Sequence, residues 1–130
     1  MRRLVRRALG DLMPSGGPMP GALDADFDTF WEKFRREAPV PFKAGVYAGA
    51  FVYTVTPVIT VGVPLPSFAL PRRLRDKHAD RVVQHDLYLV RQAVFLLKIA
   101  GGFAWGADPR VREKLDLPPY AGDPGGWRTK

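Results

Sequence analysis

The sequence predicts an all-α protein of four or five helices, with a kinked uncharged segment in the middle and irregular loops rich in proline and glycine. Two segments, residues 24–37 and 86–105, repeat apolar residues at the spacing of a helix. The 13 glycines and 13 prolines divide the 130 residues into short elements. A chain of this length forms one domain and can bury a core without disulfides.

The first part of the chain is strongly basic. Residues 2–13 predict a short helix with apolar residues on one side and arginines on the other. Residues 15–21 have the composition of a linker. We therefore divide the chain into a basic N-terminal helix and linker (1–23) and a helical domain with an irregular C-terminal tail (24–130). The basic helix either contacts an anionic membrane surface or forms a solvated terminus; the side chains predicted for this surface are Arg2, Arg3, Arg6 and Arg7.

Residues 24–37 show the clearest amphipathic pattern in the chain. Their aromatic residues fall at i, i+4 and i+7, which places them on one face of a helix. Either Asp24 or Asp26 is expected to cap the start of this helix, because both aspartates precede the apolar pattern. The two prolines that follow are expected to end it.

A long uncharged stretch is the most unusual feature of the sequence. No charged residue occurs from Ala44 to Pro71, and the twenty residues from Ala44 to Val63 have the length of a membrane span. We interpret residues 42–56 as a helix and residues 57–66 as extended or kinked, because proline interrupts the pattern. The stretch is expected to span a bilayer, to lie in its interface, or to be buried by a protein partner.

Residues 86–105 predict the longest helix. It is apolar on almost every side, so we expect it to be surrounded by other elements. Arg91 and Lys98 in its interior make it a poor membrane span. Gly101 and Gly102 are interpreted as positions where another backbone approaches this helix.

Two further helices are predicted over residues 71–84 and 110–115, the second capped by Asp108. The only two histidines, His78 and His85, are seven residues apart. Helical histidine pairs that bind metals are usually three or four residues apart. We therefore expect both to be ordinary packing or surface residues.

The residue types exclude several kinds of chemistry. There is no cysteine, so disulfides, thiolate metal sites and a cysteine nucleophile are impossible. Neither serine lies in a GxSxG motif, and no glycines form GxGxxG after a predicted strand. We predict no catalytic, cofactor-binding or metal-binding residues and no small-molecule substrate. The formal charge of +7 favours anionic partners, but the lack of a recognised binding motif argues against nucleic acid.

A run in the second half, SFALPRRLRDKHADRVVQHDLYLVRQAVFLLKIAGGFAWGADPRVREKLDLPPYAG, resembles a known helical region. The resemblance is to the segment that precedes the flavin domain in long-chain alcohol oxidases of the glucose–methanol–choline (GMC) oxidoreductase family. The run also resembles companion subunits of the gluconate 2-dehydrogenase subunit 3 type, and the similarity extends loosely over residues 27–121. The residues that carry it are Leu89, Arg91, Leu97, Lys98, Trp105, Asp108, Pro109 and Val111.

This chain departs from those oxidases in one respect: no flavin-binding GxGxxG follows the helical region. The resemblance therefore implies a split arrangement, in which a separate and larger flavoprotein subunit holds the FAD and the chemistry. No residue of this chain inherits a catalytic or flavin-binding role from the resemblance.

Together these observations predict a non-catalytic accessory subunit that docks on and stabilises a larger FAD-dependent GMC-type oxidoreductase at a membrane surface. The alternative is a small single-span accessory subunit of another respiratory or photosynthetic complex. Because the start of the chain lacks the apolar core of a secretory signal, the cytoplasmic side of the membrane is expected. The residues predicted to form the partner interface are Phe27, Phe30, Trp31, Phe34, Tyr47, Phe51, Tyr53, Phe95, Phe103 and Trp105.

Overall fold

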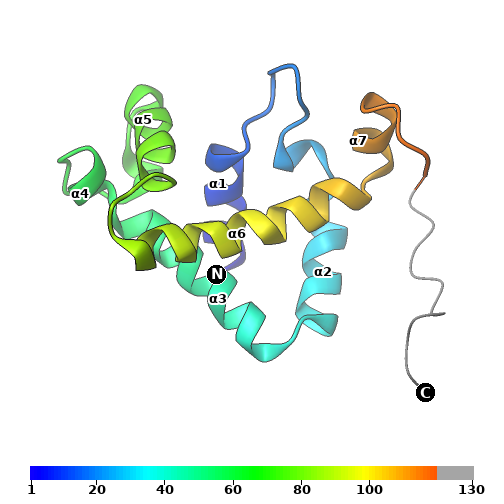
Figure 1. Ribbon diagram of the computed structural model, residues 1–130, viewed down its shortest axis with the longest axis horizontal. Helices are drawn as coiled ribbons and strands as arrows, with labels where there is room; N and C mark the ends of the chain where they lie inside the picture. Colours follow the sequence, from blue (N-terminus) through cyan, green and yellow to red (C-terminus); the bar gives the residue numbers. More distant parts are fainter. Residues whose placement is uncertain (120–130) are drawn as a thin grey trace.

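The computed structural model describes residues 1–119, and all regular secondary structure in this part of the chain is helical (Figure 1). The predicted all-α fold is confirmed. The described residues form seven α-helices rather than four or five, and the one that we did not predict is the short helix after the kink in the uncharged segment. The α-helices are α1 (Arg2–Leu12), α2 (Phe27–Glu37), α3 (Val40–Val55), α4 (Pro57–Thr60), α5 (Arg72–Val82), α6 (Tyr88–Ala107) and α7 (Pro109–Lys114), and the 3-10 turns are η1 (Ala22–Asp24) and η2 (Ser67–Ala69).

The crossing of α3 and α6 is the centre of the fold. A Cβ atom placed on Gly49 of α3 would lie only 2.3 Å from the carbonyl oxygen of Ala93 on α6. One placed on Gly45 would lie 3.0 Å from Cδ1 of Leu96. Glycine at these two positions, one helical turn apart, lets the two helices approach closely.

The prediction for the glycines of α6 is corrected by these contacts. The close approach of another backbone occurs at Gly49, not at Gly101 or Gly102. Gly101 is buried and makes room for the side chains of Leu9 and Met13 instead. A Cβ atom on Gly102 would have no other atom within 4 Å, so this glycine borders open space.

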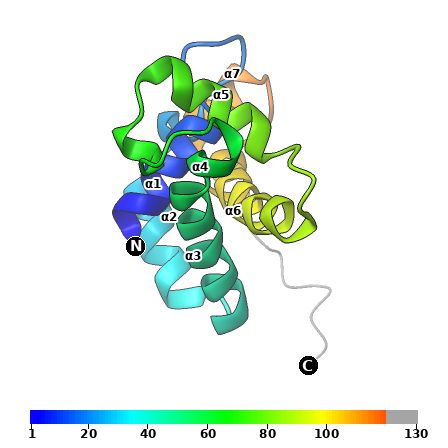
Figure 2. The same ribbon diagram turned by 90° about the vertical axis from the view of Figure 1, so that its left-hand side faces the viewer.

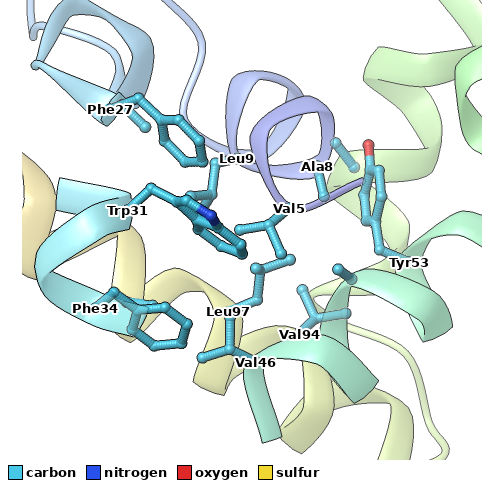
Figure 3. Close-up of a cluster of buried hydrophobic side chains, with 14 of the residues drawn as sticks. Val5, Ala8, Leu9, Phe27, Trp31, Phe34, Val46, Tyr53, Val94 and Leu97 are labelled. Carbon is cyan, nitrogen blue, oxygen red and sulfur yellow. The ribbon is translucent and has the colours of Figure 1, made fainter. Parts of the chain in front are cut away.

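Helix α1 is part of the core rather than an appended segment. Val5 is fully buried, and Ala8 and Leu9 are each 1% exposed. These side chains pack among residues of α3 and α6, as Figure 3 shows for Val46, Val94 and Leu97. The division that we placed after residue 23 therefore does not separate two cores.

Helix α2 closes one side of this core with aromatic rings. Trp31 stacks on Phe27 at a centroid distance of 5.8 Å and packs against Phe34 at 5.5 Å. The backbone N–H of Thr29 donates to Oδ1 of Asp26 at 3.1 Å, so Asp26 is the cap. Asp24, the other candidate for the cap, lies in η1, where its carboxylate accepts a hydrogen bond from the backbone N–H of Gly21.

The uncharged segment is kinked, as predicted. Helix α3 ends at Val55 and α4 begins two residues later at Pro57, whose missing N–H prevents a continuous helix. Residues 57–60 are a helical turn rather than extended chain. Gly62 then takes a φ of +73°, a left-handed conformation that favours glycine, and turns the chain toward η2.

No helix within residues 1–119 combines the length and the apolar character needed to cross a membrane. This finding applies to α3 and to α6, the two longest helices of the fold.

Asp108 connects the start of α7 with the start of α2. As predicted, it caps α7: its Oδ1 accepts hydrogen bonds from the backbone N–H groups of Arg110 and Val111. Its Oδ2 accepts a third, at 2.8 Å, from the backbone of Asp26 at the start of α2. Burial would raise the pKa of Asp108, but these hydrogen bonds outweigh burial and lower it. The predicted irregular tail, which follows Leu117, lies outside the described residues except for residues 118 and 119, which have no regular structure.

Candidate docking surface

The ten aromatic residues predicted for a partner interface separate into three groups. Four are buried in the core, three are partly buried and three are exposed. For the buried group the prediction is corrected, because core packing already surrounds these side chains. The buried residues are Phe27, Trp31, Phe34 and Tyr53, the partly buried ones are Phe30, Tyr47 and Trp105, and the exposed ones are Phe51, Phe95 and Phe103.

The exposed aromatic residues belong to α3 and α6, the two helices that pack most extensively, and we call the outer surface of this helix pair the α3–α6 face. Phe95 is 57% exposed and Phe103 is 62% exposed, whereas Leu97 between them is fully buried on the opposite side of α6. Leu96 reaches across to Gly45 and so joins the outer surfaces of the two helices. The exposed hydrophobic residues of the α3–α6 face are Phe51, Val55, Tyr88, Leu89, Phe95 and Phe103.

An aromatic groove adjoins this face at Phe103 and runs between α2 and the end of α6. Its volume is about 740 Å³. Phe42 packs edge-on against Phe103 at 6.2 Å, and Phe30 stacks on Phe34 at 5.7 Å. Gly102 and Gly106 also line the groove, and neither would bring a Cβ atom near another residue. Lys33 and Glu37 stand among the lining residues as the charged groups from α2.

The four arginines predicted to meet a membrane are all exposed, but they face two directions. Arg2 forms an ion pair with Asp28, and the guanidinium of Arg6 lies 5.9 Å from the centre of the Phe27 ring, so both face α2. Arg7 instead lies 5.0 Å from the ring of Phe68, just before α5. Only one side of α1 therefore faces α5.

The basic side of α1 and the α3–α6 face point in different directions. Leu9 of α1 packs against Gly101, on the inner side of α6. Phe95 and Phe103 emerge from the outer side of the same helix. Figure 2 shows α1 and α6 toward opposite edges of the molecule. One flat partner or membrane therefore cannot cover both surfaces at once.

A buried polar cluster links α3, α4 and α5. His78 is fully buried, and its Nε2 lies 2.8 Å from the backbone carbonyl oxygen of Tyr53, which can only accept. Nε2 therefore carries the proton, and the neutral ring accepts from the hydroxyl of Thr60 at Nδ1 (2.6 Å). The hydroxyl of Tyr53 donates to Asp11 at 3.1 Å. Both ring nitrogens are occupied in this cluster, so it has the character of a structural element.

Burial determines the protonation of this cluster. Desolvation lowers the pKa of His78 and raises the pKa of Asp11. Desolvation and the neighbouring Asp11 carboxylate both raise the pKa of Tyr53, in keeping with its role as a donor. His78 was expected to be a packing or surface residue, and only the fold shows that it is completely buried. Within residues 1–119, no three His, Cys, Asp or Glu side chains are grouped to hold a metal ion.

The lowered pKa of His78 predicts that the folded protein loses stability in mild acid. The unfolded state takes up a proton near the unperturbed value of about 6.5, whereas the folded state does so only at lower pH. The free energy of unfolding should therefore be greatest above that value and should fall as the pH decreases toward the lowered folded-state pKa. Denaturant titrations at several pH values measure this trend.

A His78→Gln variant isolates the contribution of this residue, because a glutamine can keep both a donor and an acceptor but does not titrate. We expect the acid-induced loss of stability to be smaller in this variant and to persist in His85→Gln. Asp11 acts with the opposite sign, since a raised carboxyl pKa favours proton binding by the folded state. An unchanged acid-induced loss in His78→Gln would contradict the assignment.

No family model matches this chain. No curated protein and no solved structure matches it either. The surfaces described above therefore have to be interpreted from their own chemistry.

Proposed function

We propose that this chain is a non-catalytic accessory subunit that docks on and stabilises a larger protein, with the α3–α6 face as the contact surface. The observation that carries the proposal is the exposure of large apolar side chains on two adjacent helices, of which Phe95 and Phe103 are each more than half exposed. Contiguous apolar surface of this kind usually marks an interaction site. Interfaces are also enriched in aromatic residues at their centres.

The adjoining groove supports the same proposal. Its lining of phenylalanine rings, with an open floor at two glycines, can receive an apolar side chain or a helix edge from a partner. Lys33 and Glu37 supply the charged groups that set orientation at the edge of such contacts. The face and the groove meet at Phe103, so one partner could cover both.

The proposed class of partner is an FAD-dependent oxidoreductase of the GMC type, at a membrane surface. This part of the proposal is supported by the resemblance of the run from Ser67 onward to the helical region that precedes the flavin domain of those enzymes. In this arrangement the partner holds the FAD and carries out the reaction, and this chain protects and positions the partner's surface.

Native affinity purification with an absorbance spectrum tests the proposal. A tagged chain, isolated without denaturant from the cells that produce it, should retain a larger polypeptide whose spectrum is that of an oxidised flavin. A colourless, monomeric preparation would argue against the flavoprotein partner. A colourless complex with another protein would keep the docking surface and overturn the partner class.

Negative charge introduced on the α3–α6 face should release the partner. We expect the double substitution Phe51→Asp and Phe95→Asp to weaken binding by up to about a thousandfold, because each central aromatic contact contributes about 2 kcal/mol, or about thirtyfold, and two are removed. Both side chains are 57% exposed, so the fold should tolerate the change. Binding can be measured by titrating the purified partner in a calorimeter or by surface plasmon resonance.

Met19→Asp is the matched control, since Met19 is 52% exposed but lies in the loop between α1 and η1. This variant should bind the partner as the unsubstituted chain does. An equal loss of affinity for the partner in the control and in the double variant would contradict the assigned surface.

A further inference from the structure

We propose that the end of the molecule formed by α4, η2, α5 and the adjacent side of α1 binds an anionic lipid surface. We call this region the α4–α5 end. The proposal is independent of the flavoprotein partner, because it concerns surfaces away from the aromatic groove. In Figure 1, α4 and α5 lie at one end of the molecule, while α2 and α7 lie toward the other.

The fold brings two basic segments together that are sixty residues apart in the sequence. Helices α1 and α5 pack side by side, and Arg75 lies 3.9 Å from Asp11. Together the two helices contain nine basic and three acidic residues, which account for +6 of the formal charge of +7. Nearly all of the net positive charge of the chain is therefore concentrated in one pair of neighbouring helices.

Only part of α1 contributes to this end. Arg3 and Arg7 are one helical turn apart and so share a side of the helix. Arg7 lies over the ring of Phe68, which brings this side next to η2 and α5. Arg2 and Arg6 contact α2 instead, so our prediction of a four-arginine membrane surface is replaced by one that joins α1 to α5.

Exposed apolar side chains accompany this charge. Val58, Ile59, Leu65 and Phe68 are between 45% and 51% exposed, and no charged residue interrupts the segment that holds them. Helix α4 is fixed beside α5, because the guanidinium of Arg81 donates to the carbonyl oxygen of Thr60 at 2.7 Å. The elements that carry the apolar residues, α4 and η2, thus both pack against the basic helix α5.

The combination of apolar and basic groups favours lipid over other anions. Apolar side chains gain free energy by entering the boundary between headgroups and acyl chains, and arginine and lysine pair with anionic headgroups. Nucleic acid would use the charge but would leave the exposed Val58, Ile59 and Leu65 without a suitable contact. The uncharged segment is therefore assigned to the bilayer interface at its α4 part, without a membrane-spanning role.

Vesicle sedimentation with the full chain tests the proposal. The protein should bind vesicles of phosphatidylcholine mixed with an equal amount of phosphatidylserine, and should bind vesicles of phosphatidylcholine alone far more weakly. The double substitution Arg72→Gln and Arg73→Gln should reduce binding to the mixed vesicles by about thirtyfold, given the usual contribution of each basic residue near such a surface. Both arginines are exposed at the start of α5.

The control is Arg35→Gln with Arg36→Gln on α2, which removes the same charge from the other end of the molecule. It should reduce binding by about threefold or less, because exposed charges farther away than about 10 Å are largely screened at physiological salt. Equal losses in the two double variants would overturn the assigned site and indicate attraction by net charge only.

A label at Phe68 gives a second readout that does not depend on charge. The chain has no cysteine, so Phe68→Cys carries an environment-sensitive dye at a single position, and Glu32→Cys on α2 serves as the control. Mixed vesicles should shift the emission of the dye at position 68 to the blue and leave that at position 32 unchanged. An unshifted dye at position 68, or tighter binding to random duplex DNA than to the vesicles, would overturn the proposal.

Discussion

Gly49→Ala should lower the free energy of unfolding by about 3 kcal/mol, although alanine is the better helix former. The added Cβ atom would lie 2.3 Å from the carbonyl oxygen of Ala93 and 3.2 Å from Cβ of Leu97. These atoms belong to the backbone and to the base of a side chain of α6, so they cannot rotate away. The helices must separate where they pack most extensively, and every buried contact around the crossing weakens with them. Urea denaturation followed by circular dichroism measures the change.

Gly102→Ala is the matched control for this prediction. It is also a glycine in the middle of a helix, but an added Cβ atom there would meet nothing within 4 Å. We expect this variant to gain about 0.5–1 kcal/mol, because alanine restricts the unfolded chain and favours the helix. Similar stabilities for the two variants would mean that α3 and α6 do not cross at Gly49.

Leu97→Ala should destabilise the protein by about 3–4 kcal/mol, whereas Phe95→Ala should change its stability by no more than about 0.5 kcal/mol. Leu97 is fully buried between α1 and α3, and its removal leaves a cavity that the crossing helices cannot fill. Phe95, two residues earlier, is 57% exposed on the α3–α6 face. The pair therefore measures which side of α6 faces the core, by thermal or urea unfolding.

The same pair connects stability with the proposed function. We expect Phe95→Ala to keep its fold and to bind the partner more weakly, since this ring belongs to the docking surface. If Phe95→Ala destabilised the isolated chain as much as Leu97→Ala, the rotation of α6 would be wrong. The exposed face on which the docking proposal rests would then not exist.

The sequence alone determined where the helices lie and how several of them begin and end. Asp108 was recognisable as a cap and Asp26 as one of two candidates, because each stands directly before a run with helical periodicity and each can accept backbone hydrogen bonds. Proline at position 57 located the kink for an equally local reason. The excess of apolar residues on α6 predicted a helix surrounded on almost every side, whereas in the described residues Leu89, Phe95 and Phe103 of this helix are each more than half exposed.

Only the tertiary structure decided which apolar residues are buried in the core and which are exposed to a partner. Periodicity identifies a helix face but not what packs on it, so Trp31 and Phe95 looked equivalent although one is 4% exposed and the other 57% exposed. The burial of α1, the enclosure of His78 and the meeting of Arg7 with Phe68 all depend on contacts between residues far apart in the chain. No local pattern encodes such contacts, because they depend on how the helices pack against one another in space.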